Sequence, residues 1–334
     1  MLSKTEAENP LLEVGGLRKY FPTEINLFGP NRVKGNSGTR HFVRAVDGVS
    51  FSIFRGQTLG FVGESGCGKS TLARLILRLI DPDEGKVCFE GQDLTGLKRN
   101  QLRPIRRKMQ IIFQNPYASL NPRLSINSML AEIMRVHGVP GDEIGAKVRT
   151  LIELVGLDRK DLGKYPHEFS GGQRQRIGIA RALAVNPVFI VADEPVSSLD
   201  VSIQAQIINL LVELQKNLDL TYLFIAHDLG VVKYISDKIA VMYMGQIVEM
   251  ADSSDLYDRA AHPYTRMLLS SLPGFMKVGG GVDAPSRGDV FTSGGLEGGC
   301  KFRSRCAQVL AKCAGSEPRL KEVGRGHFVS CFLY

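Results

Sequence analysis

No stretch of this 334-residue sequence approaches the roughly 18 uninterrupted apolar residues that a membrane-spanning helix needs. The segment that comes nearest, residues 72–80, is interrupted by Arg74 and Arg78. The N-terminal residues (MLSKTEAENPLLEV) lack the apolar core of a secretory signal, so we expect no such signal. Together these absences predict a protein that works in the cytoplasm.

The composition excludes three further classes of chain. With 43% hydrophobic residues, 23% charged residues and six cysteines, it is not that of a disordered, collagen-like or disulfide-scaffold protein. The formal net charge is +8, but the densest basic stretch, residues 98–108, lacks the interleaved aromatic residues of a nucleic-acid platform, and we expect no nucleic-acid partner. At roughly 150 residues per domain, the length predicts about two domains, or one large domain with an appendage.

The order of apolar runs predicts the fold class. Residues 58–62 (TLGFV) are typical of a strand, which is followed by a glycine loop and a helix. Residues 188–192 (VFIVA) and 222–226 (YLFIA) are typical of buried strands, and residues 114–187 are mainly helical in pattern. Strands that alternate with helices predict an α/β fold with a parallel sheet covered by helices on both faces.

Polar and glycine-rich segments indicate where the chain divides. Residues 21–41 are rich in Gly, Pro and Asn, and we interpret them as a loop or a long hairpin tip. The composition shifts after about residue 250, and residues 278–299 have the pattern of a flexible, glycine-rich linker. We therefore predict a first domain over residues 1–250, with a helical subdomain at about 114–187, and a C-terminal extension over residues 251–334.

A glycine-rich loop stands between the strand at 58–62 and the helix that follows it. Its residues fit the pattern GxxxxGK[ST] and are Gly63, Glu64, Ser65, Gly66, Cys67, Gly68, Lys69 and Ser70, followed by Thr71. Glycines let successive backbone N–H groups turn inward around phosphate oxygens, and the helix N-terminus adds its positive dipole end. Lys69 can reach the β- and γ-phosphates, and the Ser70 hydroxyl can bind Mg²⁺. The alternative is a glycine-rich turn capped by Ser70, but the flanking strand and helix favour a nucleotide site.

An acidic pair, Asp193 and Glu194, ends the buried strand VFIVA. Ligands gather at the carboxyl ends of strands in open α/β sheets. Asp193 is suited to holding Mg²⁺, usually through water, and Glu194 is suited to polarising an attacking water molecule. A helix-capping acidic pair is the alternative, and the phosphate loop upstream argues against it.

A second helix opens with the motif Ser170, Gly171, Gly172 and Gln173. Its start also offers free N–H groups to a phosphate, so one chain carries two phosphate-recognising elements. At this point the sequence resembles the ATP-binding subunit of ABC transporters. The family's signature, most commonly LSGGQ, matches FSGGQ at residues 169–173 and precedes the acidic strand, as the family requires.

The resemblance implies roles for further residues between about 11 and 250. Gln114 resembles the Q-loop glutamine, which contacts Mg²⁺ and couples to the membrane subunit. Ser198-Leu199-Asp200 resembles the D-loop, which crosses the dimer interface. His227 resembles the switch histidine that senses the γ-phosphate. Phe21 resembles the aromatic residue that stacks on adenine, with Tyr20 as a possible substitute.

The resemblance also implies an architecture and a mechanism. It implies a RecA-like parallel sheet with an antiparallel β subdomain and a helical subdomain, binding ATP and Mg²⁺. Two such subunits form a head-to-tail dimer, with ATP between the phosphate loop of one and the signature of the other. Hydrolysis then depends on dimer closure, because charge stabilisation comes from both chains. Closure moves coupling helices of the membrane subunits, so that ATP drives alternating access.

A narrower resemblance concerns oligopeptide and dipeptide importers. The segment QNPYASLNPR at residues 114–123 and the motif HPYT at residues 262–265 resemble those of that subfamily, in its F-type ATPase. The implied partners are a D-type ATPase subunit, two transmembrane permease subunits and an extracytoplasmic peptide-binding protein. The implied location is the cytoplasmic face of the inner membrane, held there peripherally by the permease. Related importers carry nickel chelates, glutathione or opines, so the cargo stays open.

The C-terminal extension contains four cysteines that none of these motifs explains. They are Cys300, Cys306, Cys313 and Cys331, spaced C-x5-C-x6-C-x17-C. Disulfides are improbable in the cytosol, and structural zinc sites usually have tighter C-x2–4-C pairs. Four thiolates from a loop-rich tail can hold a [4Fe–4S] cluster, and the resemblance to importer ATPases with this tail implies one. Cysteines without a metal are the alternative. We expect a structural tail, outside the ATP motifs.

Two other classes of function compete with an importer ATPase. Soluble ABC ATPases that act on nucleic acid or ribosomes generally carry two cassettes in one chain, whereas this sequence has a single phosphate loop and a single signature. A regulatory binding protein without turnover is the other alternative. The presence of both Glu194 and His227 argues against it.

Overall fold

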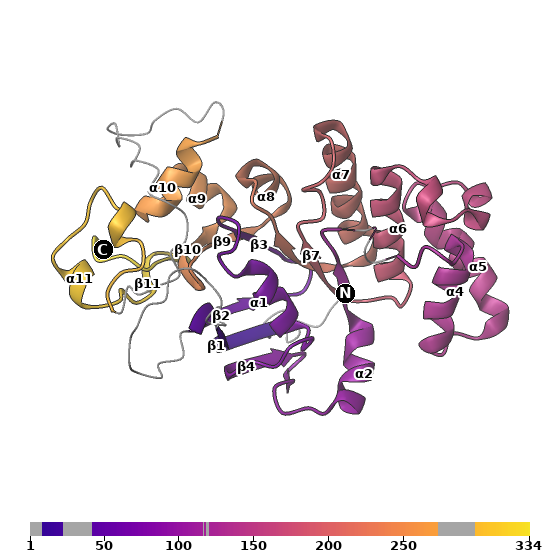
Figure 1. The fold of residues 1–334 in the computed structure, drawn as a ribbon, viewed down its shortest axis with the longest axis horizontal. Coiled ribbons are helices and arrows are strands. Elements are labelled where there is room, and N and C mark those ends of the chain that lie inside the picture. Colours follow the sequence, from indigo (N-terminus) through magenta and orange to yellow (C-terminus); the bar gives the residue numbers. More distant parts are fainter. Residues whose placement is uncertain (1–8, 23–41, 116, 118–119, 273–297) are drawn as a thin grey trace, which may run out of the picture.

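The computed structural model describes residues 9–22, 42–115, 117, 120–272 and 298–334 (Figure 1). Most of the predicted polar insertion and of the glycine-rich linker lies outside the described residues, as do three positions of the segment at 114–123. None of the helices in the described part of the chain has the length and apolarity that crossing a bilayer requires.

The centre of the molecule is an eight-stranded sheet in the order β11-β12-β10-β9-β3-β8-β7-β6. Its strands are β3 (Thr58–Val62), β6 (Met109–Ile112), β7 (Phe189–Asp193), β8 (Thr221–Ile225), β9 (Lys238–Tyr243), β10 (Gln246–Asp252), β11 (Lys321–Gly324) and β12 (His327–Val329). The five strands β9, β3, β8, β7 and β6 pair in parallel, and β10, β12 and β11 continue the sheet in antiparallel pairing. The predicted parallel sheet is confirmed, with an antiparallel edge added.

Both faces of the parallel strands are buried, which explains their continuous apolar runs. In β7, Phe189 and Val191 belong to one hydrophobic core, whereas Ile190 and Ala192 belong to the other. The same alternation divides the residues of β8 and β9 between the two cores. Each core therefore lies on its own face of the sheet and needs its own cover of helices.

Helices provide that cover on both faces (Figure 1). The α-helices of the described residues are α1 (Lys69–Ile76), α2 (Arg99–Lys108), α4 (Ile126–Val136), α5 (Gly141–Leu154), α6 (Gly171–Leu183), α7 (Val201–Leu218), α8 (Leu229–Ile235), α9 (Ser253–Asp258), α10 (Pro263–Ser270) and, in the C-terminal tail, α11 (Lys312–Gly315). The buried residues of α1 belong to one core, and those of α6, α7 and α8 belong to the other.

Two further layers complete the fold. A four-stranded antiparallel sheet has the order β2-β1-β4-β5, from β1 (Leu12–Pro22), β2 (Phe42–Ile53), β4 (Glu84–Phe89) and β5 (Gln92–Asp93). The predicted helical segment holds α4, α5 and α6 with the short 3-10 helices η1 (Arg159–Gly163) and η2 (Pro166–Glu168). The parallel sheet, the antiparallel sheet and the helical layer together confirm the fold class.

The C-terminal tail is built into the main sheet. Strand β12 pairs with β10, so that Glu249 is opposite Val329. Strand β10 itself spans the predicted division at residue 250, which stays a prediction. Figure 1 shows the tail, in yellow, against the β10 side of the molecule.

A fully buried carboxylate, Glu249, ties the tail to the core. It accepts hydrogen bonds from the backbone N–H groups of Ala261 (2.7 Å) and His262 (2.9 Å). Its Oε1 is also 2.7 Å from Nε2 of His327 in β12. A buried carboxylate is stable only when its oxygens are satisfied in this way, so the tail strand, the start of α10 and β10 depend on one another.

Candidate active site

The carboxyl ends of β3, β7 and β8 meet at one edge of the sheet, because the three strands run parallel with β8 between the other two. The glycine-rich loop follows β3, the acidic pair ends β7, and His227 follows β8. The backbone confirms this proximity, since the N–H of Glu194 donates to the carbonyl of Ile225 at 2.9 Å. Three predicted motifs, far apart in the sequence, therefore come together.

The loop after β3 folds around the Lys69 side chain. The Lys69 ammonium donates to the carbonyls of Gly63 (2.7 Å) and Glu64 (3.0 Å), and the residue is only 4% exposed. A Cβ at Gly63 would stand 2.2 Å from the Met242 carbonyl, and one at Gly68 would stand 2.0 Å from that of Ala45. Only glycine fits at these positions, so the close packing of the loop against neighbouring backbone depends on both.

Helix α1 starts at the loop with Gly68 as its N-cap, in the left-handed conformation. No side chain caps this helix end. The first N–H groups of a helix lack partners within it, and together with the helix dipole they favour an anion. The ammonium and the helix end thus form a cradle suited to phosphate oxygens.

Ser70 and Asp193 meet at the edge of this cradle. The Ser70 hydroxyl donates to Oδ1 of Asp193 at 2.9 Å, and Asp193 is 7% exposed. Burial raises the pKa of Asp193 above its ordinary value, the Ser70 hydrogen bond opposes that rise, and the charge of Glu194 adds to it. A buried carboxylate and a hydroxyl are hard oxygen donors, and Mg²⁺ is commonly held by one or two such groups with substrate phosphates and water. The two residues therefore fit a magnesium ion that accompanies a nucleotide.

Glu194 is the centre of a polar cluster beside the cradle. Its Oε2 accepts a hydrogen bond from the Gln114 amide at 3.0 Å and lies 3.4 Å from Nδ1 of His227. Glu194 has a φ of +47°, a left-handed conformation that costs energy for a residue with a side chain. The cluster brings together three residues that the sequence predicted for hydrolysis.

The loop has two anchors that sequence reasoning did not assign. The backbone N–H of Glu64 donates to the Tyr264 hydroxyl at 3.0 Å. The Glu64 carboxylate accepts two hydrogen bonds from the Arg305 guanidinium, at 2.7 and 2.8 Å. Tyr264 belongs to the motif HPYT, which was interpreted only as a family resemblance, whereas no pattern in the sequence singles out Arg305. The tail thus contacts the phosphate loop directly, through a residue next to Cys306.

The signature residues occupy another part of the molecule, at the start of α6 (Figure 1). Ser170 caps this helix, accepting from the Gln173 N–H at 3.3 Å, and the Gln173 side chain accepts from the Ser170 N–H at 3.0 Å. Asp200 is the exposed N-cap of α7. Within the described residues, the side-chain hydrogen bonds of Ser170 and Gln173 join these two residues to each other and not to the phosphate loop.

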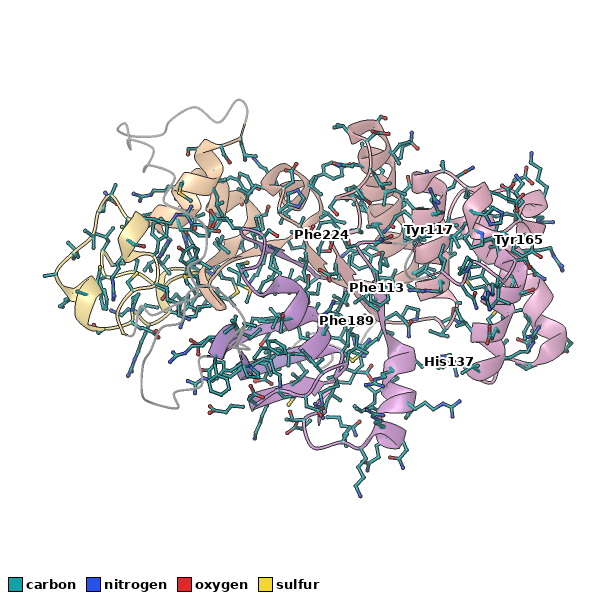
Figure 2. The ribbon with its side chains drawn as sticks, viewed as in Figure 1. Phe113, Tyr117, His137, Tyr165, Phe189 and Phe224 are labelled. Carbon is teal, nitrogen blue, oxygen red and sulfur yellow. The ribbon has the colours of Figure 1, made fainter. Side chains whose placement is uncertain are left out.

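The two candidate aromatic residues at the end of β1 have different surroundings. The Tyr20 hydroxyl donates to Asp47 at 2.7 Å, and the Arg44 guanidinium lies 5.7 Å from the Tyr20 ring. Burial and Asp47 raise the pKa of Tyr20 to about 12. The Phe21 ring is 39% exposed. Phe21 is the better placed of the two to receive a planar base. Figure 2 labels other aromatic side chains, among them Phe189 and Phe224, which are fully buried in β7 and β8.

The four tail cysteines line a single pocket, together with His262 and Phe302. All six cysteines of the chain are free. Burial raises the pKa of Cys300, and the other three tail cysteines raise it further, because they are near enough to act on its charge. Within the described residues, however, no group of three or more His, Cys, Asp or Glu side chains is arranged to hold a metal ion.

Two family models match the sequence. The model described as ABC transporter matches residues 46–197, and the one described as oligopeptide/dipeptide transporter, C-terminal region, matches residues 248–313. The first match contains the phosphate loop, Gln114, the signature and the acidic pair. The second begins within β10 and reaches the third tail cysteine.

Transport ATP-binding proteins of bacteria resemble the chain over most of its length. The oligopeptide transport ATP-binding protein AppF of Bacillus subtilis is 48% identical over 335 residues, which cover 98% of each chain. A putative peptide import ATP-binding protein of Brucella ovis is 48% identical over 97% of this chain and 98% of its own. The oligopeptide transport ATP-binding protein OppF of Bacillus subtilis is 53% identical over 79% of this chain and 82% of its own.

Solved structures resemble the fold. The protein cbiO1 of Clostridium perfringens, part of the ABC transporter complex cbiONQ, matches with a TM-score of 0.63 and 26% identity, over 75% of this chain and 92% of its own. A dimeric ATP-binding cassette in a post-hydrolysis state, bound to ADP and phosphate, matches with a TM-score of 0.61 and 26% identity, over 72% and 98%.

The cluster around Glu194 generates a prediction about turnover. We expect Glu194→Gln to bind ATP but to lose turnover, because an amide cannot polarise water while Lys69 and Ser70 still hold the phosphates. The loss of an oriented base should lower the rate by on the order of 10²-fold or more. The measurement is the ATPase rate of the assembled complex, with Glu213→Gln on the exposed face of α7 as the matched control. A near-normal rate for Glu194→Gln would contradict the assignment.

Proposed function

The chain belongs to the family of ABC transporter ATP-binding proteins, and we propose that it hydrolyses ATP to energise the import of di- or oligopeptides. The observation that carries this proposal is the joint match of cassette and C-terminal region. Relatives named for oligopeptide or peptide transport align with the chain from end to end and not only over the cassette. The convergence of Lys69, Asp193 and Glu194 supports the enzymatic part of the proposal.

The phosphate loop and α1 provide the binding half of the mechanism. The Lys69 ammonium, now held by loop carbonyls, is placed to exchange them for β- and γ-phosphate oxygens. The N–H groups at the start of α1 and the helix dipole add further attraction. Ser70, Asp193 and Gln114 would hold Mg²⁺, which when bound neutralises charge on the phosphates. Phe21 would stack on adenine.

The cluster at β7 and β8 provides the hydrolytic half. The Glu194 carboxylate accepts a proton from the attacking water and directs that water toward the γ-phosphorus atom. Gln114 and His227 both contact the same oxygen, Oε2, which fixes the orientation of the carboxylate. His227 is 57% exposed at its side chain, so its ring is free to meet a γ-phosphate that arrives from solvent.

The signature supports a dimeric mechanism. The signature lies at the start of α6, apart from the chain's own phosphate loop, and consists of Ser170, Gly171, Gly172 and Gln173. Asp200 is exposed at the start of the next helix, α7. We propose that they complete the ATP site of a second ATPase subunit, of the D type. Two transmembrane permease subunits and an extracytoplasmic peptide-binding protein would complete the transporter. The chain would then lie at the cytoplasmic face of the membrane, held by the permease.

The function is tested by assembly and transport. Co-expressed with the permease subunits of a peptide importer from the same organism, the chain should co-purify with them, and vesicles containing the complex should accumulate labelled oligopeptide only with ATP. Glu194→Gln should abolish the accumulation without disturbing assembly. Bound ligand identified by mass spectrometry would define the cargo. Accumulation of a nickel chelate, glutathione or an opine in place of peptide would overturn the peptide assignment and leave the ATPase assignment in place.

The proposed dimer predicts in which site a signature variant acts. In a mixed complex, Ser170→Arg should impair the ATP site whose phosphate loop belongs to the other subunit, because the added side chain fills the space for that nucleotide. Photo-crosslinking of a nucleotide to each subunit separates the two sites. Impairment at Lys69 of the same chain instead would show that the head-to-tail arrangement is wrong.

We further propose that the tail cysteines hold a [4Fe–4S] cluster. The donor chemistry fits, since Cys300, Cys306, Cys313 and Cys331 line one pocket and bind no partner through a disulfide. A bound cluster would have a structural role, joining the segment at 300–313 to Cys331 near the C-terminus.

The tail proposal is tested by its iron content. Protein purified without oxygen should be brown and contain about four irons per chain, if each cysteine supplies one thiolate. Cys306→Ser should lower the iron content, whereas Cys88→Ser in β4 should not. Colourless protein with bound zinc, or with four titratable thiols in the tail, would reject the cluster.

A further inference from the structure

The closest polar contact between the C-terminal tail and the phosphate loop is the pair formed by Arg305 and Glu64. Both terminal nitrogens of the guanidinium donate to the carboxylate, at 2.8 and 2.7 Å, one to each oxygen. The two side chains are 25% and 26% exposed, so the pair is largely withdrawn from solvent. A bidentate pair of this kind fixes geometry as well as charge.

The position of Arg305 is set by the packing of the tail. It ends the 3-10 helix η3 (Arg303–Arg305), directly before Cys306. Its guanidinium lies 5.8 Å from the Phe302 ring and 5.9 Å from the Tyr243 ring. These two rings pack against each other and against Tyr264, with ring centres 4.6 to 5.5 Å apart. Arg305 thus reaches the loop from a rigid aromatic base.

Glu64 is held at three points. Arg305 binds its carboxylate, the Tyr264 hydroxyl accepts from its N–H at 3.0 Å, and the Lys69 ammonium donates to its carbonyl at 3.0 Å. Two of the three partners come from the C-terminal region, after residue 250. The second residue of the phosphate loop is therefore positioned by the tail and by α10.

The charge of Glu64 creates a problem that Arg305 solves. A free carboxylate in a phosphate loop repels the phosphates that the loop has to bind, since like charges interact strongly in partly buried sites. A paired guanidinium cancels that charge and holds the carboxylate on the tail side of the loop. We propose that Arg305 is a positioning residue for nucleotide binding, which keeps Glu64 neutralised and the loop open to phosphate. The proposal rests on the proposed function, because it requires that ATP binds at this loop.

The test compares ATP dissociation constants of the full chain, measured by equilibrium dialysis. Arg305→Gln should weaken ATP binding by roughly three- to tenfold, the effect of one uncompensated charge near the phosphates. The deficit should shrink at high salt, because salt screens the repulsion. Arg305→Lys keeps the charge without the bidentate geometry. Its ATP dissociation constant should lie between those of the unmodified chain and Arg305→Gln.

Two further variants separate charge compensation from simple loss of tail structure. When Glu64→Gln is already present, Arg305→Gln should weaken ATP binding no further, because no carboxylate is left to neutralise. Arg303→Gln is the matched control, since the Arg303 guanidinium in the same 3-10 helix donates, within the described residues, to the tail carbonyls of Gly298 and Ala314 and not to the phosphate loop. It should leave the ATP dissociation constant unchanged.

The outcomes are distinct. Equal effects of Arg303→Gln and Arg305→Gln, an unchanged constant in Arg305→Gln, or a deficit that persists with Glu64→Gln would each overturn the positioning role. Lys69→Ala tests the underlying function, because ATP binding that is insensitive to Lys69 would show that this loop is not the nucleotide site. In that case both proposals fail, whereas binding that depends on Lys69 but not on Arg305 refutes only the second.

Discussion

The parallel pairing of β8 between β3 and β7 is the constraint on which the site depends. Ile225, the last residue of β8, is opposite both Phe61 in β3 and Asp193 in β7. The chain that leaves each strand therefore starts from the same edge of the sheet. The phosphate loop, the acidic pair and His227 converge because of this register, and a slip of one residue would turn their side chains to the other face. Two buried cores, one on each face, hold the register in place.

Charge is distributed at this edge in a way that suits a polyphosphate with its metal ion. The Lys69 ammonium and the uncapped end of α1 supply positive potential, whereas Asp193 and Glu194 supply carboxylates on the opposite side of the cradle. Burial raises the pKa of Asp193, and the charge of Glu194 adds to that rise. A bound divalent cation would bring positive charge to this acidic pair, so binding of nucleotide and metal should stabilise the site that holds them.

The C-terminal region is joined to the catalytic core through side chains and not only through the chain. Glu249 and His327 connect β10 to β12, Lys301 donates to Asp47 at 2.8 Å, and Arg305 reaches Glu64. Asp47 in turn accepts a hydrogen bond from Tyr20, beside the aromatic residue expected to stack on adenine. The tail therefore contacts the phosphate loop and, through Asp47, the residues at the end of β1.

Local patterns were enough to predict the parallel sheet, the helical layer, the phosphate loop and the acidic pair. These features show in local sequence patterns: a run of apolar residues predicts a buried strand, and the spacing of glycines with Lys69 and Ser70 predicts a phosphate loop. The contacts of Arg305 and Tyr264 with Glu64 span 241 and 200 residues, and no periodicity connects their positions. The different surroundings of Tyr20 and Phe21 likewise depend on Asp47 and Arg44, which are distant in the sequence. The sequence by itself determined the elements and their chemistry, whereas tertiary structure decided which side chains face one another, because a long-range contact depends on how whole elements pack.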